Sequence, residues 1–304
     1  MNEEKIKELQ KRANEIRKEI LEMCIFGKTG HVTSSFSCAE ILTALYFGEV
    51  LKYNPQIPKW QNRDRFILSK GQASPILYVI LSNAGFFPKD WLNTFCDIDA
   101  KFGVHLQCDV PGVEFTTGSL GHGLGLGAGV ALAAKLNQKD YHTFVLLGDA
   151  ELYEGSVWEA AMFAGHHRLN NLIAIIDRNG FGVLQPTEDF LKLEPLGKKF
   201  EAFGWEVKRI NGHSIKEILN ALENFRGHKR DKPLMIIADT IKGKGIKFME
   251  NVALWHGAAP ISQEDIERAR KELKEYSMES EYEYKERIDQ SKERVERVFY
   301  GERI

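Results

Sequence analysis

The chain has 304 residues, 43% of them hydrophobic, which is enough for one large domain or two small ones with a buried core. Lysine plus arginine (41) nearly balance aspartate plus glutamate (43), which excludes a strong overall field for nucleic acid or an anionic membrane. The charged amino terminus is unlike a signal peptide and no apolar run reaches spanning length, so we expect a cytoplasmic protein. The cysteines at 24, 38, 96 and 108 lack metal or disulfide spacing, and we expect buried, reduced thiols.

Apolar residues recur every three or four positions from Ile6 to Met23, which predicts an amphipathic opening helix. Short apolar runs then predict strands at 65–69, 142–149, 172–177, 205–210 and 233–239. Helical patterns lie at 124–136, 156–168, 190–203 and 214–225. Continuous apolar strands that alternate with helices indicate an α/β fold, with a parallel sheet covered by helices on both faces.

The composition changes near residue 260. About half of the residues from Ser262 onward are charged, and Ser262 with Asp265 is typical of a capped helix start. We therefore expect an α/β domain over 1–260 and a charged helical extension over 261–304.

Two predicted strands end in oxygen ligands. Asp149 closes the strand at 142–149, and Asn179 follows the strand at 172–177. Ligands collect at the carboxyl ends of parallel strands, so the two side chains can converge on one crevice. A carboxylate, an amide oxygen and a main-chain carbonyl suit Mg²⁺, with diphosphate and water completing the shell. The alternative is that both residues only cap the helices that follow them.

A glycine-rich stretch at 116–135, TTGSLGHGLGLGAGVALAAK, allows the backbone to approach a phosphate closely. One alternative is a dinucleotide fingerprint, because Gly123-x-Gly125-x-x-Ala128 fits G-x-G-x-x-A. That match is weak, since no predicted strand leads directly into it. A second interpretation, a close-packed helix at a subunit interface, is compatible with cofactor binding.

Five blocks in order resemble the N-terminal half of transketolase, over roughly residues 10 to 260. The blocks are TGHVTSSFSCAEILTALYF (29–47), RDRFILSKGQASPILY (63–78), PGVEFTTGSLGHGLGLGAGVALAAK (111–135), GDAELYEGSVWEAAMFAGHHRLNNLIAIIDRNG (148–180) and DTIKGKGIKFMENVALWHG (239–257). The resemblance implies the thiamine-diphosphate-binding fold, with thiamine diphosphate and Mg²⁺ as cofactors, or Ca²⁺ or Mn²⁺ in place of Mg²⁺.

The resemblance also implies site residues. Asp149, Asn179 and the main-chain carbonyl of Phe181 would bind the metal. The positions that would lie along the cofactor are Gln72, Gly118, Ser119, Leu120, Asp149, Ala150, Asn179, Val183 and His256.

Three histidines match family histidines of the substrate funnel and the thiazolium end of the cofactor: His31, His105 and His256. Histidine suits proton transfer near neutral pH. Glu154 falls where the family has an acid that meets its counterpart across the dimer, which implies a shared proton. We assign the remaining histidines, at 122, 142, 166, 167, 213 and 228, to packing or the surface.

Two departures from the family pattern concern the substrate. Gln72 replaces a histidine that contacts the diphosphate, and glutamine cannot shuttle a proton. The usual glycine-histidine-proline-glutamate is Val104-His105-Leu106-Gln107, which removes a carboxylate. An unusual sugar is therefore an alternative to the pentose-phosphate substrates of the family.

The pyrimidine-binding domain of the family, whose glutamate activates the cofactor, has no counterpart after residue 260. We therefore expect a separately encoded C-terminal transketolase subunit and an α2β2 heterotetramer that transfers a two-carbon ketol unit between sugar phosphates. The alternatives are a subunit similar to 1-deoxyxylulose-5-phosphate synthase or to a 2-oxoacid dehydrogenase, and a non-catalytic scaffold or regulatory subunit.

Overall fold

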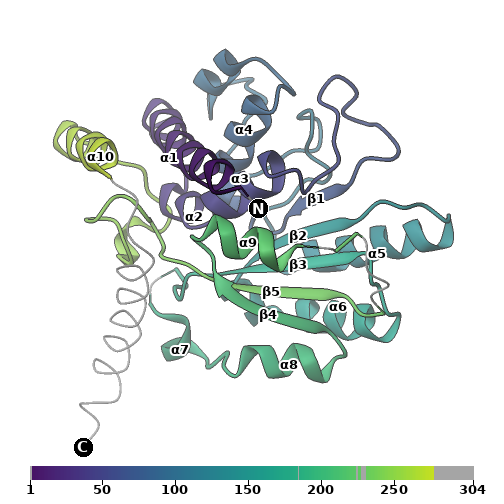
Figure 1. The fold of residues 1–304 in the computed structure, drawn as a ribbon. Helices are drawn as coiled ribbons and strands as arrows, with labels where there is room; N and C mark the ends of the chain where they lie inside the picture. Colours follow the sequence, from purple (N-terminus) through teal and green to yellow (C-terminus); the bar gives the residue numbers. More distant parts are fainter. Residues whose placement is uncertain (1, 184, 224, 227–230, 277–304) are drawn as a thin grey trace, which may run out of the picture.

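The computed structural model describes residues 2–183, 185–223, 225–226 and 231–276, and its centre is one parallel sheet (Figure 1). Its strands are β1 (Arg65–Leu68), β2 (Thr143–Gly148), β3 (Leu172–Arg178), β4 (Glu206–Asn211) and β5 (Leu234–Asp239). They lie in the order β1-β2-β3-β5-β4, and every neighbouring pair is parallel. The five predicted strands and the predicted α/β fold are confirmed.

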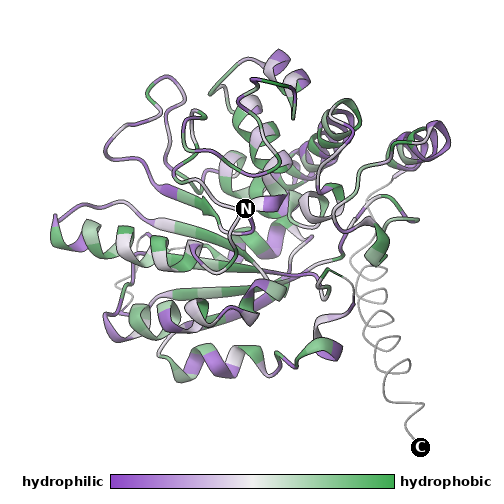
Figure 2. Cartoon of the chain, turned by 180° about the vertical axis from the view of Figure 1, so that it is seen from behind, coloured by the Kyte–Doolittle hydropathy of each residue, from purple (hydrophilic) through white to green (hydrophobic). Residues whose placement is uncertain are grey.

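Both faces of the sheet are covered by helices, which explains why its central strands are apolar throughout rather than alternating. Within β2, Phe144 and Leu146 belong to one buried cluster, whereas Val145 and Leu147 belong to the other. Figure 2 shows the same arrangement by hydropathy, with hydrophobic strands between helices of mixed character. The sheet is therefore the middle layer of three.

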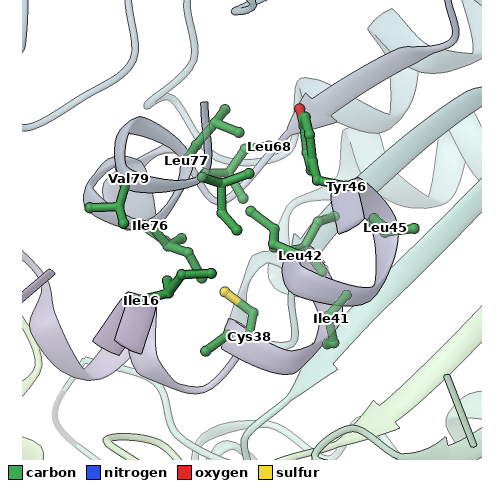
Figure 3. Packing of buried hydrophobic residues seen from close by; sticks show 14 of the residues in the cluster. Ile16, Cys38, Ile41, Leu42, Leu45, Tyr46, Leu68, Ile76, Leu77 and Val79 are labelled. Atoms are coloured by element: carbon green, nitrogen blue, oxygen red, sulfur yellow. The ribbon is translucent and has the colours of Figure 1, made fainter. Parts of the chain in front are cut away.

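Helices α1 (Glu3–Phe26), α3 (Ala39–Phe47), α4 (Ser74–Asn83) and α9 (Ile215–Ala221) cover the first face. Side chains from three of them meet in Figure 3, where Ile16 of α1 lies near Leu42 of α3 and Ile76 of α4. All three side chains are at most 1% exposed. The amphipathic stripe predicted for the opening helix is thus buried against α3 and α4.

Helices α5 (Gly123–Leu136), α6 (Gly155–His166) and α8 (Leu196–Ala202) cover the second face. Small residues allow this close packing. A methyl group on Gly127 would collide with Val145 of β2, and one on Gly165 would overlap the carbonyl oxygen of Phe203. Glycine is therefore a packing requirement at these two positions.

We expect Gly165→Ala to destabilise the chain by about 1–3 kcal/mol, because the new methyl group has no space beside Phe203. The matched control is Gly129→Ala in α5, where no atom of the described residues outside the helix backbone lies within 4 Å of the added carbon. That substitution should raise stability by up to about 1 kcal/mol, since alanine favours a helix. Urea unfolding measures both changes, and an unchanged midpoint for Gly165→Ala would contradict the packing argument.

Two helix predictions are wrong in extent. The segment 190–203 is not one helix: α7 (Thr187–Phe190) ends there, and α8 begins only after Pro195, because proline favours a helix start and disrupts an interior. The helix predicted at 214–225 is α9, which ends at Ala221. Shorter helical turns lie at α2 (Val32–Phe36), η1 (Gly71–Ala73), η2 (Lys89–Thr94), η3 (Ala150–Tyr153) and η4 (Ala253–Trp255).

The cysteine prediction is half wrong. Cys24 and Cys38 are buried as expected, but Cys96 and Cys108 are exposed. Both exposed residues lie in the irregular connection between η2 and α5, which no periodic pattern places inside or outside the core.

Helix α10 (Gln263–Glu275) begins at the predicted cap, where the Ser262 side chain accepts a hydrogen bond from the Asp265 amide at 3.1 Å. It packs on α1, and Arg270 pairs with Glu22 at 2.6 Å. The boundary at residue 260 stays a prediction, and 277–304 lie outside the described residues. In the part of the chain that the structure describes, no helix combines the length and hydrophobicity needed to cross a membrane.

Candidate functional site

The carboxyl ends of β1, β2, β3 and β5 meet at one edge of the sheet, the edge nearest α7 and α10 in Figure 1. Asp149 follows β2, Asn179 follows β3 and Lys242 lies three residues after β5. Gln72 lies in the turn after β1. Parallel strands collect functional residues at this edge, and the structure confirms that the predicted strand-end residues come together there.

Asp149 is held rigidly. Its side chain is 1% exposed, Oδ1 accepts a hydrogen bond from the Ala150 amide at 2.8 Å, and Oδ2 accepts one from the Gly180 amide at 2.6 Å. Burial raises the pKa of this carboxyl, while the Arg178 guanidinium, 3.0 Å from Oδ2, opposes the rise. A carboxylate has about four lone-pair sites, so Oδ1 can still accept a cation.

Asn179 lies beside Asp149, because the next residue, Gly180, donates its amide hydrogen bond to the Asp149 carboxylate. Its Nδ2 donates to the Asp177 carbonyl at 3.3 Å, and its Oδ1 accepts from the Phe181 amide at 3.2 Å. These two contacts orient the amide oxygen and leave it one lone pair. Gly180 has φ of 79°, which favours glycine in this turn.

Arg178 is a functional candidate that sequence analysis missed. It donates to Asp149 and, at 2.6 Å each, to Thr187 Oγ1 and Glu188 Oε1. It thereby connects the predicted metal ligand to helix α7. Its position between Asp177 and Asn179 was visible in the sequence, but the direction of its side chain was not.

The glycine-rich loop before α5 lies against the same edge. A methyl group on Gly71 would collide with the backbone of Thr117 and Gly118, and one on Gly118 would lie 2.8 Å from the His105 ring. The Gly121 amide donates to Glu151 at 2.9 Å. No strand leads directly into α5, which itself leads into β2, so the dinucleotide alternative lacks its required context.

Glu151 is a second missed residue. It is 1% exposed and its oxygens accept from the Gly121 amide, the Gly148 amide at 3.0 Å and the Ser69 hydroxyl. Burial raises the pKa of this carboxyl. It joins the glycine-rich loop to the ends of β1 and β2, which is a structural role.

Two buried lysines, also missed, supply positive charge. Lys70 donates a hydrogen bond to the Ser34 carbonyl at 2.9 Å and forms an ion pair with Asp177. Burial by itself would raise the pKa of Asp177, but the charge of Lys70 lowers it below its ordinary value. Lys242 is 2% exposed and contacts Ser34 Oγ at 3.4 Å. Burial, and then Lys70, lower the pKa of Lys242 to about 8. No ion pair of the described residues includes Lys242, so this edge of the sheet has cationic charge available for an anion.

The predicted histidines are brought together. The rings of His31 and His256 are 5.8 Å apart in an edge-on arrangement, and His105 lies close enough to lower the pKa of His31. Burial is the main cause of a pKa of about 4 for His31 and about 3 for His256, so both rings are neutral at pH 7. Neutral imidazoles keep one donor and one acceptor nitrogen each.

Several buried polar atoms at this edge have no hydrogen-bond partner among the described residues. They include Nδ1 of His31, Nδ1 of His256, Oε1 of Gln72 and Oγ1 of Thr117. Buried polar groups are normally paired, so such a set is typical of a site that a ligand completes. With the cationic Lys242, it fits a polar, anionic molecule seated between the glycine-rich loop and the strand ends.

The remaining predicted residues lie in the segments after β2 and β3 and in the glycine-rich loop. Ala150 begins the turn after Asp149, while Ser119 and Leu120 lie in the glycine-rich loop. Val183 is 61% exposed, and Glu154 is also exposed and touches Gly121. The expected contact of Glu154 with its own copy stays a prediction. His228 lies outside the described residues.

Comparisons with known proteins agree with this geometry. Residues 9–299 match the family described as transketolase, thiamine diphosphate binding domain. The chain is 40% identical over 268 residues to one of the subunits of apulose-4-phosphate transketolase from Phocaeicola vulgatus, covering 88% of this chain and 94% of that protein. It is 42% identical over 259 residues to a 6-deoxy-6-sulfo-D-fructose transketolase subunit of Clostridium sp., covering 84% and 92%.

Among solved structures, transketolase of Campylobacter jejuni superposes with a TM-score of 0.82 at 34% identity, covering 95% of this chain and 46% of that chain. The chain thus spans less than half the length of that enzyme. The same holds for human transketolase, to which the chain is 38% identical over a match that covers 43% of the human protein. Sequence, fold and site geometry lead to one conclusion: this chain belongs to the transketolase family and contains its thiamine diphosphate binding domain.

Proposed function

We propose that this chain is the cofactor-binding subunit of a two-subunit transketolase that uses thiamine diphosphate and a divalent metal, Mg²⁺ by preference. The observation that carries the proposal is the convergence of Asp149, Asn179 and the cationic Lys242 at the carboxyl edge of the sheet. Oxygen ligands for a hard cation beside a buried ammonium suit a metal-bound diphosphate.

The metal would be held by Asp149, Asn179 and the carbonyl of Phe181, and the diphosphate by Lys242, Ser34 and the backbone of Gly118 and its neighbours. Among the described residues, no three His, Cys, Asp or Glu side chains form a group that could bind a metal ion. The proposed ligand set is consistent with that finding, because it contains only one such side chain, the Asp149 carboxylate, together with the Asn179 amide oxygen and the Phe181 carbonyl. Diphosphate oxygens would then be needed to complete the shell.

Thiamine diphosphate, when bound, supplies stabilisation of the carbanion formed on a two-carbon unit. The chain contributes orientation and proton transfer. His31 and His256, both neutral at pH 7, can donate to a sugar hydroxyl or accept its proton. His105, at the exposed rim, would line the approach.

The partner would be a C-terminal subunit with the pyrimidine-binding domain, in an α2β2 heterotetramer. Two observations support it. The relatives from P. vulgatus and Clostridium sp. are named as subunits and are matched over almost their full length. Large apolar side chains are exposed next to site residues, including Val183 at 61% and Leu254 at 81%. A second chain that covers these side chains would also close the crevice from water.

The substrate is proposed as a ketose phosphate with an altered carbon skeleton or substituent. Gln72 replaces the family histidine, and its Oε1 is buried with no hydrogen-bond partner in the part of the chain that the structure describes. It can therefore accept a hydrogen bond from the substrate or cofactor but cannot transfer a proton. The two relatives named for apulose 4-phosphate and 6-deoxy-6-sulfo-D-fructose act on unusual sugars, as their names state.

Activity should appear only when this chain is combined with its partner subunit. The test is to purify the full chain, add the co-purifying subunit, Mg²⁺ and thiamine diphosphate, and assay a panel of ketose and aldose phosphates. Two-carbon transfer by the pair, at least about a hundredfold faster than by either subunit, supports the proposal. Use of pyruvate would favour the 1-deoxyxylulose-5-phosphate-synthase-like alternative. Failure of the pair to bind thiamine diphosphate would favour the scaffold alternative.

A further inference from the structure

The loop that carries Lys242 has little regular structure of its own. It follows β5, contains Gly243 and Gly245 with φ of 80° and 104°, and belongs to no helix or strand. Hydrogen bonds to other segments hold its backbone: the Thr240 amide donates to the Arg178 carbonyl at 3.1 Å, and the Gly243 amide donates to the Thr33 carbonyl at 3.0 Å. The position of Lys242 thus depends on contacts from outside the loop.

One of these contacts is made by a buried histidine. The Ile241 amide, directly before Lys242, donates to Nε2 of His213 at 2.8 Å. His213 follows β4 and is 7% exposed. Because Nε2 accepts this hydrogen bond, the ring proton lies on Nδ1, which is 2.8 Å from Oε2 of Glu40.

Glu40 determines that tautomer. It is fully buried, and its two oxygens accept from Nδ1 of His213, from both terminal nitrogens of Arg17 at 2.7 Å and from Gln10 at 3.1 Å. Although burial opposes ionisation, Arg17 and His213 hold the pKa of Glu40 below its ordinary value. A carboxylate kept ionised and acceptor-only fixes the donor nitrogen of the ring.

We propose that His213 is a positioning residue for the cofactor: it holds the Ile241 amide, and through it places the Lys242 ammonium in the diphosphate crevice. Glu40 and Arg17 lock the ring in the required tautomer. The proposal rests on the proposed function, because it takes the anion that Lys242 meets to be the diphosphate. The proposal also gives a role to the buried polar network that α1, α3 and the turn after β4 share.

Two substitutions separate positioning from packing. His213→Asn keeps a donor near the Nδ1 position for Glu40 but does not reach Ile241. His213→Gln carries an acceptor to the Nε2 position and should restore the contact. In the full chain with its partner subunit and Mg²⁺, we expect His213→Asn to weaken thiamine diphosphate binding about tenfold, as loss of one buried hydrogen bond implies. His213→Gln should stay within about twofold of wild type.

A second measurement does not involve the cofactor. Hydrogen exchange of the Ile241 amide in the full chain alone should accelerate about tenfold in His213→Asn and little in His213→Gln. The apparent KM for the cofactor should rise in His213→Asn, with kcat at saturating cofactor unchanged. The matched control is His142→Asn, the same substitution at the amino end of β2. It should change neither the exchange rate of the Ile241 amide nor the apparent KM for the cofactor. If His213→Asn does not fold, His213→Met, which fills the volume without a comparable acceptor, takes its place.

The outcomes are distinct. One outcome is that the wild-type pair binds thiamine diphosphate and His213→Asn changes neither the cofactor affinity nor the exchange rate of the Ile241 amide. That result overturns the positioning role of His213 but leaves the proposed function intact. Equal losses in His213→Asn and His213→Gln also overturn it, because they indicate packing. If the wild-type pair binds no thiamine diphosphate, the proposed function fails and this inference fails with it. Selective loss in His213→Asn, restored in His213→Gln, supports the proposal.

Discussion

Asp149→Asn is expected to weaken Mg²⁺-dependent thiamine diphosphate binding by at least about a hundredfold, the loss typical when one member of a buried charge pair is neutralised. The substitution keeps the shape of the side chain but removes the charge that a hard cation prefers. Arg178 keeps its contacts with Thr187 and Glu188, so the fold should persist. Titration calorimetry with and without Mg²⁺ measures the loss.

Asp239→Asn is the matched control for this experiment. Asp239 also closes a strand of the sheet, but its carboxylate pairs with Arg209 at 2.8 Å on the outer side of β5. This control should bind metal and cofactor as wild type does. If Asp149→Asn binds both as tightly as the control, the assignment of Asp149 to the metal site is wrong.

Lys242→Met is expected to weaken thiamine diphosphate binding by about 2–4 kcal/mol, or roughly 30- to 1,000-fold, because a buried ammonium is removed from an anion site. The loss should be much smaller for thiamine, which lacks the diphosphate. Lys247→Met, on the exposed side of the same segment, is the matched control and should bind normally. Equal losses for thiamine and its diphosphate would contradict the proposed contact.

The same substitution should stabilise the cofactor-free chain. Lys242 has a pKa of about 8 in the fold, against an ordinary value of 10.5, because burial and Lys70 disfavour its charge. Between these two pH values the unfolded chain binds more protons, so wild-type stability should rise with pH through this window. Lys242→Met should remove that rise and add up to about 3 kcal/mol at pH 7. Urea unfolding at pH 7 and at pH 10 tests both expectations.

Much of the fold followed from local pattern. The strands are apolar because both faces of the sheet are covered, and this predicted each of them to within a few residues. The same pattern placed Asp149 and Asn179 at neighbouring strand ends, where the structure joins them through the Gly180 amide. The helix expected at 190–203 is not continuous, because Pro195 interrupts the segment and α8 begins only after it.

Local sequence patterns were enough to predict the strands, the oxygen-bearing side chains of Asp149 and Asn179 at their ends, and the family of the chain. Which charged side chains meet at the carboxyl edge of the sheet depends on tertiary contacts. Lys242 meets Ser34, and His213 meets Ile241 and Glu40, across separations of 208, 28 and 173 residues. These contacts exist because β5 inserts between β3 and β4, which brings the loop after β5 against α2 and beside the turn after β4. Strand order is a property of the packed sheet as a whole, and no local spacing in the sequence encodes it.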